Sequence, residues 1–166
     1  STRVMQIILG LDLSAEVSII IGPHFTEDNR LPEIPKDSEL LMHVHRTPER
    51  IWEIMARCHM AIATFGVTAY ELLACGIPTV MLSISPDHAL SAEKIHTAGC
   101  GISVGIHDAI TDESLGGVIL DLFGNKEKLQ TMKEHCAGLV DGKGASRVAS
   151  IIESCYKEKI ASSSIN

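Results

Sequence analysis

The chain has few aromatic residues and no excess of positive charge, and both shortages narrow the functions open to it. Phe, Trp and Tyr make up 4% of the 166 residues. Single-stranded nucleic acids are bound largely by base stacking on aromatic side chains, and here 14 Lys and Arg face 21 Asp and Glu, for a formal net charge of −7. We therefore expect no nucleic-acid partner, although a local pocket for an anion remains compatible with this charge.

The chain also lacks the cysteine spacing of a metal or redox site. No two of its five cysteines form a CxxC pair, which is the minimal signal for a structural zinc or thioredoxin-type site. Most lie in apolar surroundings, which is typical of small buried thiols, and reduced thiols favour a cytoplasmic protein. No apolar run approaches the ~20 residues of a membrane-spanning helix. We predict no cofactor, and membrane association only at the periphery through a partner.

Short β-branched runs alternate with longer segments of helical pattern. Strands are predicted over residues 17–21, 40–45, 60–63, 78–82 and 102–104, and helices from Pro48 to Cys58 and over 67–75, 89–98, 112–122, 125–138 and 144–158. This alternation is typical of βαβ units, in which strands covered on both faces are apolar throughout. We predict an α/β fold with a doubly wound, Rossmann-like parallel sheet and helices on both faces.

Both ends of the chain bear on its domain organisation. Residues 2–10 have a helical pattern, whereas a doubly wound domain normally starts with a strand, so we expect the sequence to begin within a domain. We assign residues 1–160 to one domain that lacks its first strand. The Ser-rich residues 161–166 are predicted to be a frayed tail.

The segment Thr64-Phe65-Gly66-Val67-Thr68 joins an apolar strand directly to a predicted helix. Ligands of open α/β sheets bind beyond the C-terminal ends of the strands, and the unpaired first amides of a helix favour a phosphate or carboxylate. Gly66 would let the backbone approach an anion, and Thr68 would add a hydroxyl donor. The same residues also suit a plain turn in which Thr64 caps the helix. No GxxxxGK[ST] pattern is present, so nucleotide hydrolysis at this loop is not predicted.

Glu71 stands one helical turn beyond Thr68 and can lie on the same face. Bound phosphates would repel this carboxylate unless it contacts a neutral part of the ligand. The vicinal hydroxyls of a ribose would suit, because they offer two donors to one carboxylate. The alternative is a solvated glutamate on the helix surface.

The eight histidines include three further candidates for a ligand or metal contact. His43 and His45 point to the same side of a predicted strand, which suits two metal ligands, but no third ligand lies nearby, so we predict no metal site. His24 follows a strand end at the ligand edge. His88 is the histidine that we favour for ligand binding, because it follows the strand 78–82 and its imidazole can donate a hydrogen bond in either protonation state.

Residues 63–80, ATFGVTAYELLACGIPTV, resemble the donor-binding segment of the two-domain GT-B glycosyltransferase superfamily. They are more narrowly similar to the UDP-sugar hydrolases of pseudaminic acid biosynthesis and to spore-coat polysaccharide glycosyltransferases. The loop SPDH at 85–88, the sequence AGCG at 98–101 and the element VDGKGASRV at 140–148 extend the similarity. The resemblance covers most of residues 2–155 and implies one Rossmann-like half of a GT-B fold.

This resemblance implies roles for particular positions. Residues 66–68 match the loop that holds the donor diphosphate, and Glu71 matches the carboxylate that binds the ribose hydroxyls. Asp87 and His88 occupy the place where relatives often have Asn-Gln or Gln-Gln against the donor sugar, and Asp in place of an amide removes donors and adds charge. The full set of expected substrate-binding residues is Thr64, Phe65, Gly66, Val67, Thr68, Glu71, Asp87 and His88.

The resemblance also implies that a part of the family's architecture has no counterpart here. The family's catalytic His lies in an N-terminal domain that nothing in this chain matches, so the catalytic residues are unknown. The family's C-terminal domain also opens with a central strand just before the helix that begins here at Thr2. Its absence would expose backbone donors and acceptors, so either the chain is an excised fragment or another segment or a partner chain supplies the pairing.

The function that the resemblance implies is binding of a nucleotide-diphosphate sugar, UDP-linked. The chain would be the C-terminal half of a glycosyltransferase or UDP-sugar hydrolase in surface-polysaccharide or nonulosonic-acid biosynthesis, inactive on its own. One alternative is a non-catalytic donor-binding subunit of a two-chain glycosyltransferase, and another is a sugar-nucleotide epimerase. The fold alone does not decide among them, because α/β scaffolds carry many chemistries.

Overall fold

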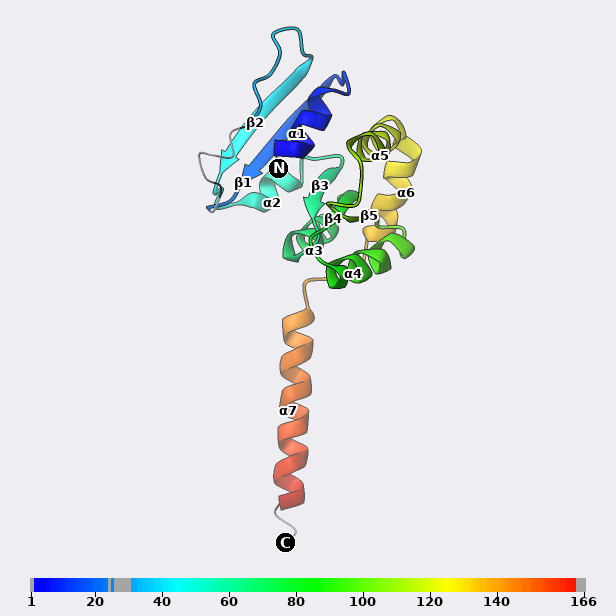
Figure 1. Ribbon diagram of the computed structural model, residues 1–166. Coiled ribbons are helices and arrows are strands. Elements are labelled where there is room, and N and C mark those ends of the chain that lie inside the picture. The colour runs from blue at the N-terminus through cyan, green and yellow to red at the C-terminus, as the bar shows by residue number, and fades with distance from the viewer. Residues whose placement is uncertain (1, 24, 26–30, 164–166) are drawn as a thin grey trace.

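The computed structural model describes residues 2–23, 25 and 31–163 of the chain, which alternate between helices and strands (Figure 1). The elements are, in order, α1 (Thr2–Leu9), β1 (Ala15–Ile21), β2 (Leu40–Arg46), α2 (Ile51–Met55), β3 (Ala61–Thr64), α3 (Val67–Ala74), β4 (Thr79–Ser83), α4 (Pro86–Thr97), β5 (Gly101–Ile106), α5 (Asp112–Gly124), α6 (Lys126–Cys136) and α7 (Gly144–Ser163).

Strand β4 forms the centre of the core, and all five of its residues are buried. Val80 and Leu82 belong to a hydrophobic cluster with residues of α1 and α5. Met81, between them, belongs to a second cluster with residues of α3 and α4. Because successive side chains of a strand point to opposite faces, these two clusters lie on opposite faces of the sheet. The predicted α/β fold with helices on both faces is confirmed.

The strands form two parallel sheets. β1 pairs with β2, and β3, β4 and β5 form a second sheet in that order. Across the described ranges, no backbone hydrogen bond joins β1 to β3. Each of these two strands is therefore paired along one edge only, and the doubly wound sheet is present as two pieces.

Two predicted helices have other boundaries. The helix predicted to reach Cys58 is the five-residue α2. It begins late because Thr47 has a positive φ (42°) and residues 49–50 form a turn, and it ends early because the chain after Met55 continues in i→i+3 hydrogen bonds. Helix α4 begins at Pro86 instead of residue 89, because Ser85 caps it with its side chain.

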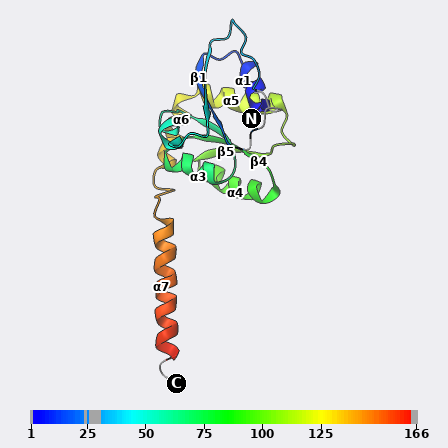
Figure 2. The same ribbon diagram turned by 90° about the vertical axis from the view of Figure 1, so that its left-hand side faces the viewer.

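Helix α7 extends away from the rest of the chain in both views (Figure 1, Figure 2). It continues to Ser163, three residues into the segment predicted as a frayed tail, and residues 164–166 lie outside the described part of the chain. No helix of the described residues, α7 included, has the length and apolar character needed to span a membrane.

Candidate functional site

The connection from β3 to α3 leaves the start of a helix open. Gly66 is the N-cap of α3, and no side chain caps this helix. The loop is anchored to the neighbouring strand β4, because the Phe65 amide donates to the Leu82 carbonyl at 2.7 Å. The first-turn amides of α3 at Val67 and Thr68 are therefore left for solvent or a ligand, at the positive end of the helix dipole.

Gly66 does not serve as a turn residue in this connection. Its φ of 168° is extended backbone that other residues also adopt, and an added Cβ would have no atom within 4 Å. Thr64 does not cap the helix either, since the N-cap is Gly66. The plain-turn alternative, in which Thr64 caps and Gly66 turns, is therefore wrong. The glycine leaves open space at the N-cap of α3, where a side chain would begin.

Thr68 and Glu71 are both exposed on α3. They stand three residues apart, so their side chains lie on neighbouring turns of one face. Val67 is 76% exposed beside them. This arrangement is compatible with both readings of Glu71, as a ligand contact and as a solvated helix residue.

The side chain of Phe65 lies in the core. It is 7% exposed and belongs to the cluster that contains Met81. Its ring makes edge contacts with Tyr70 and His88, with centroid distances of 5.8 and 5.7 Å. Of the expected substrate-binding residues, Phe65 is thus limited to its backbone for any ligand contact.

Asp87 and His88 lie in the first turn of α4, at the same end of the sheet as the start of α3. Asp87 is exposed and His88 is half-buried. The Ser85 hydroxyl accepts from the His88 amide at 3.3 Å. The start of α4 is therefore capped by a side chain, whereas the start of α3 is not. The contact between the Phe65 and His88 rings links the two connections.

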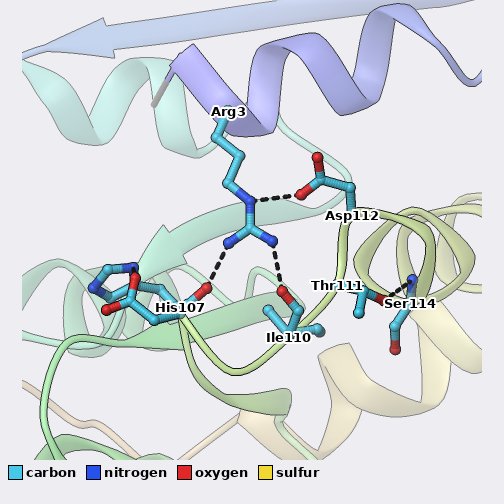
Figure 3. Close-up of polar contacts among 7 residues, drawn as sticks. Arg3, His107, Ile110, Thr111, Asp112 and Ser114 are labelled. Atoms are coloured by element: carbon cyan, nitrogen blue, oxygen red, sulfur yellow. Dashed lines mark hydrogen bonds and ion pairs between the residues drawn. The ribbon is translucent and has the colours of Figure 1, made fainter.

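Arg3 contacts the residues that follow β5 (Figure 3). The sequence pattern alone did not indicate this cluster. The Arg3 guanidinium contacts Asp112 Oδ1 at 2.6 Å and donates to the carbonyls of His107 and Ile110. Thr111 caps α5 by accepting from the amide of Ser114 at 3.2 Å. These contacts fasten α1 to the β5–α5 connection. A lone Arg in an apolar helix was the available signal.

The strand histidines contact residues of the neighbouring strand. His43 Nε2 lies 3.1 Å from Glu16 Oε1, and His45 Nε2 lies 3.4 Å from Ser18 Oγ. Within the part of the chain that the structure describes, no three His, Cys, Asp or Glu side chains are grouped for a metal ion. His24 lies outside the described residues.

The DGKGASR element has a local structural role. Asp141 accepts from the amide of Lys143 at 3.0 Å and pairs with the Arg147 guanidinium at 2.7 Å, which holds the turn before α7. The hydrogen bond from Arg147, followed by that from the Lys143 amide, lowers the pKa of the Asp141 carboxyl. None of these contacts reaches the α3 connection.

The chain is similar to known proteins both in sequence and in structure. No model of a known protein family matches the chain. Over 107 residues, or 64% of the chain, it is 25% identical to the spore coat polysaccharide biosynthesis protein SpsG of Bacillus subtilis (strain 168). The solved structure of the spinosyn forosaminyltransferase SpnP matches 82% of the chain with a TM-score of 0.55 and 18% identity.

In both comparisons the chain spans about a third of the other protein, 32% of SpsG and 32% of SpnP. The structural match is to a glycosyltransferase, and the sequence match is to a protein of polysaccharide biosynthesis. Together with the parallel strands and the helices on both faces, these matches establish the architecture. The chain has the fold of a GT-B-like, glycosyltransferase-related α/β domain.

Proposed function

We propose that the chain is the donor-binding half of a glycosyltransferase-like enzyme and binds a UDP-linked sugar. The observation that carries this proposal is the uncapped start of α3, with open space at Gly66 and with Thr68 and Glu71 on the exposed face. α4 and α5, which follow the other two strands of this sheet, are each capped by a side chain.

These groups suit the three parts of a sugar nucleotide, namely its diphosphate, its ribose and its sugar. The free amides and the Thr68 hydroxyl would hold the diphosphate, and they would stabilise its charge as it leaves the anomeric carbon. The Glu71 carboxylate would accept from the two ribose hydroxyls. Asp87 and His88, on the next connection, would face the sugar.

The proposed enzyme needs a second half, which would supply the attacking group. Whether water or an acceptor hydroxyl attacks separates a hydrolase from a transferase, and the residues involved would lie outside residues 1–160. The open edges of β1 and β3 support this division, because a strand from another segment or a partner chain would satisfy both. The proposal places this assembly in the cytoplasm, which contains nucleotide sugars and whose reducing conditions keep thiols such as the five free cysteines reduced.

A thermal-shift screen tests the proposal. A ligand that binds only the folded state raises the melting temperature with its concentration. We expect UDP-sugars to raise it, and CMP-, GDP- and dTDP-sugars to raise it less at equal concentration. If none of the four raises the melting temperature, the chain has no sugar-nucleotide site of its own.

A further inference from the structure

Two buried polar atoms of the described residues have no hydrogen-bond partner, namely Ser83 Oγ and His88 Nδ1. Ser83 is fully buried, with 0% of its surface exposed. An unpaired buried donor or acceptor destabilises the folded state, so such atoms are rare in native structures and each needs an explanation. Here Ser83 is the last residue of β4 and His88 lies in the first turn of α4, on either side of one short connection.

The two side chains lie on the same face of the sheet. Ser83 follows Met81 by two positions along β4, so it points toward the layer of α3 and α4. Thr64 pairs with Leu82, and the Phe65 amide donates to the Leu82 carbonyl, which sets Phe65 beside Ser83. The Phe65 ring in turn contacts the His88 ring at 5.7 Å. Phe65 thus lies beside Ser83 on the neighbouring strand, and its ring contacts the ring of His88. These are the two residues whose side-chain atoms lack a partner.

We propose that Ser83 is a positioning residue for His88. In this arrangement the Ser83 hydroxyl donates its proton to His88 Nδ1, and each atom supplies the partner that the other lacks. This hydrogen bond satisfies both buried atoms at once and fixes the neutral ring in the tautomer that carries its proton on Nε2. Because Nδ1 is the buried nitrogen, Nε2 would be the ring nitrogen left to donate to a ligand. The identity of that ligand rests on the proposed function, whereas the hydrogen bond does not.

The tautomer can be measured without any ligand. Long-range ¹H–¹⁵N spectra of the histidine side chains, recorded where His88 is neutral and assigned with His88→Gln, should show His88 protonated on Nε2. Ser83→Ala should convert this single tautomer into a mixture. A matched control is Thr79→Val, at the other end of the same buried strand, because the Thr79 hydroxyl is already donated to the Ile77 carbonyl at 2.9 Å.

The result that overturns the proposal is a His88 tautomer that is the same in Ser83→Ala and in the parent protein. Should Ser83→Ala not fold, Ser83→Cys retains a side chain of similar size with a weak donor, and it should give an intermediate mixture. Thr79→Val should leave the His88 spectrum unchanged even if it lowers the melting temperature. A change in Thr79→Val as large as in Ser83→Ala would also overturn the proposal, because it would show a general loss of packing.

A second measurement connects the hydrogen bond to the ligand. If His88 faces the sugar, Ser83→Ala should weaken binding of a UDP-sugar by about three- to tenfold and leave binding of UDP alone unchanged. Equal weakening of both ligands would contradict a role at the sugar. Absence of binding by the parent protein would refute the proposed function and leave the tautomer result standing, so the two failures are distinguishable.

Discussion

Phe65 and His88 come from consecutive βα connections, and their rings meet edge to face with centroids 5.7 Å apart. Phe65 is buried, whereas His88 lies between the core and the surface. The contact therefore joins the open start of α3 to the capped start of α4. It holds residues of the two connections next to each other, as a ligand that contacts both would need.

Removal of the Phe65 ring should be costly. We expect Phe65→Ala to lower the free energy of unfolding by about 3–5 kcal/mol, because a buried aromatic ring leaves a cavity. Tyr70→Ala is the control, since Tyr70 touches the same ring but is 47% exposed; it should cost less than half as much. Urea denaturation measures both values, and equal losses would contradict the assignment of Phe65 to the core.

Substitution of Gly66 should separate stability from ligand binding. A Cβ at Gly66 meets no atom within 4 Å, so Gly66→Ala should change the melting temperature little. In the proposed complex the added methyl group would occupy space beside the diphosphate, and it should weaken UDP binding by about tenfold. Gly101→Ala should lower the melting temperature and leave the UDP affinity of the folded protein unchanged. Its Cβ would lie 2.8 Å from Met81 Cε and 2.9 Å from the Thr79 carbonyl. Full UDP affinity in folded Gly66→Ala would place the anion elsewhere.

The divided sheet has a consequence for amide exchange. β4 is paired on both edges, whereas β1 and β3 are each paired on one. In the isolated chain we expect the amides of β4 to be the slowest of the three strands, and alternate amides of β1 and β3 to exchange with little protection. Hydrogen-exchange NMR gives these rates residue by residue. Protection of every amide of β1 and β3 would show that their free edges are covered.

The buried thiols should make stability fall at alkaline pH. Burial, reinforced by the neighbouring Cys100, raises the pKa of Cys136 from 9.0 to about 12. Below pH 9 the thiol is protonated in both the folded and the unfolded chain, so its contribution to stability is fully present. Between about pH 9 and 12 the unfolded thiol ionises first, which favours unfolding.

Melting curves between pH 7 and 11 test this linkage. Cys136→Ala should melt lower than the parent at pH 7, because a buried side chain is lost, and its melting temperature should decline less steeply above pH 9. Cys155→Ala serves as the control, since Cys155 is exposed on α7; it should follow the parent. Parallel curves for the parent and Cys136→Ala would contradict the assigned burial.

Much of the fold was predictable because local patterns and core packing agree. The apolar run 78–82 predicts a strand buried on both faces, and β4 is such a strand. Gly76 marks the end of a helix, and it follows α3 with the positive φ (68°) that glycine adopts most readily. The start of α4 was missed, because Pro86 after a capping Ser85 was assigned to the loop rather than to the first helical position.

The sequence was less informative about the candidate site. It predicted the connection 64–68, but the periodicity did not reveal that the Phe65 side chain turns inward to meet His88. Nor did it indicate Ser83 or Arg3, because the importance of each depends on what the folded chain places around its side chain. Ser83 becomes notable only once its hydroxyl is seen to be buried without a partner, and Arg3 only once it is seen to hold the β5–α5 connection.

The central claim is that the start of α3 holds a diphosphate and that Glu71 holds its ribose, and calorimetry with UDP and with inorganic pyrophosphate tests it most directly. Thr68→Ala should weaken both ligands, whereas Glu71→Ala should weaken UDP by about tenfold and leave pyrophosphate unaffected. Glu93→Ala, an exposed acid farther along α4, is the control and should change neither. Unchanged UDP affinity in both Thr68→Ala and Glu71→Ala would contradict the account.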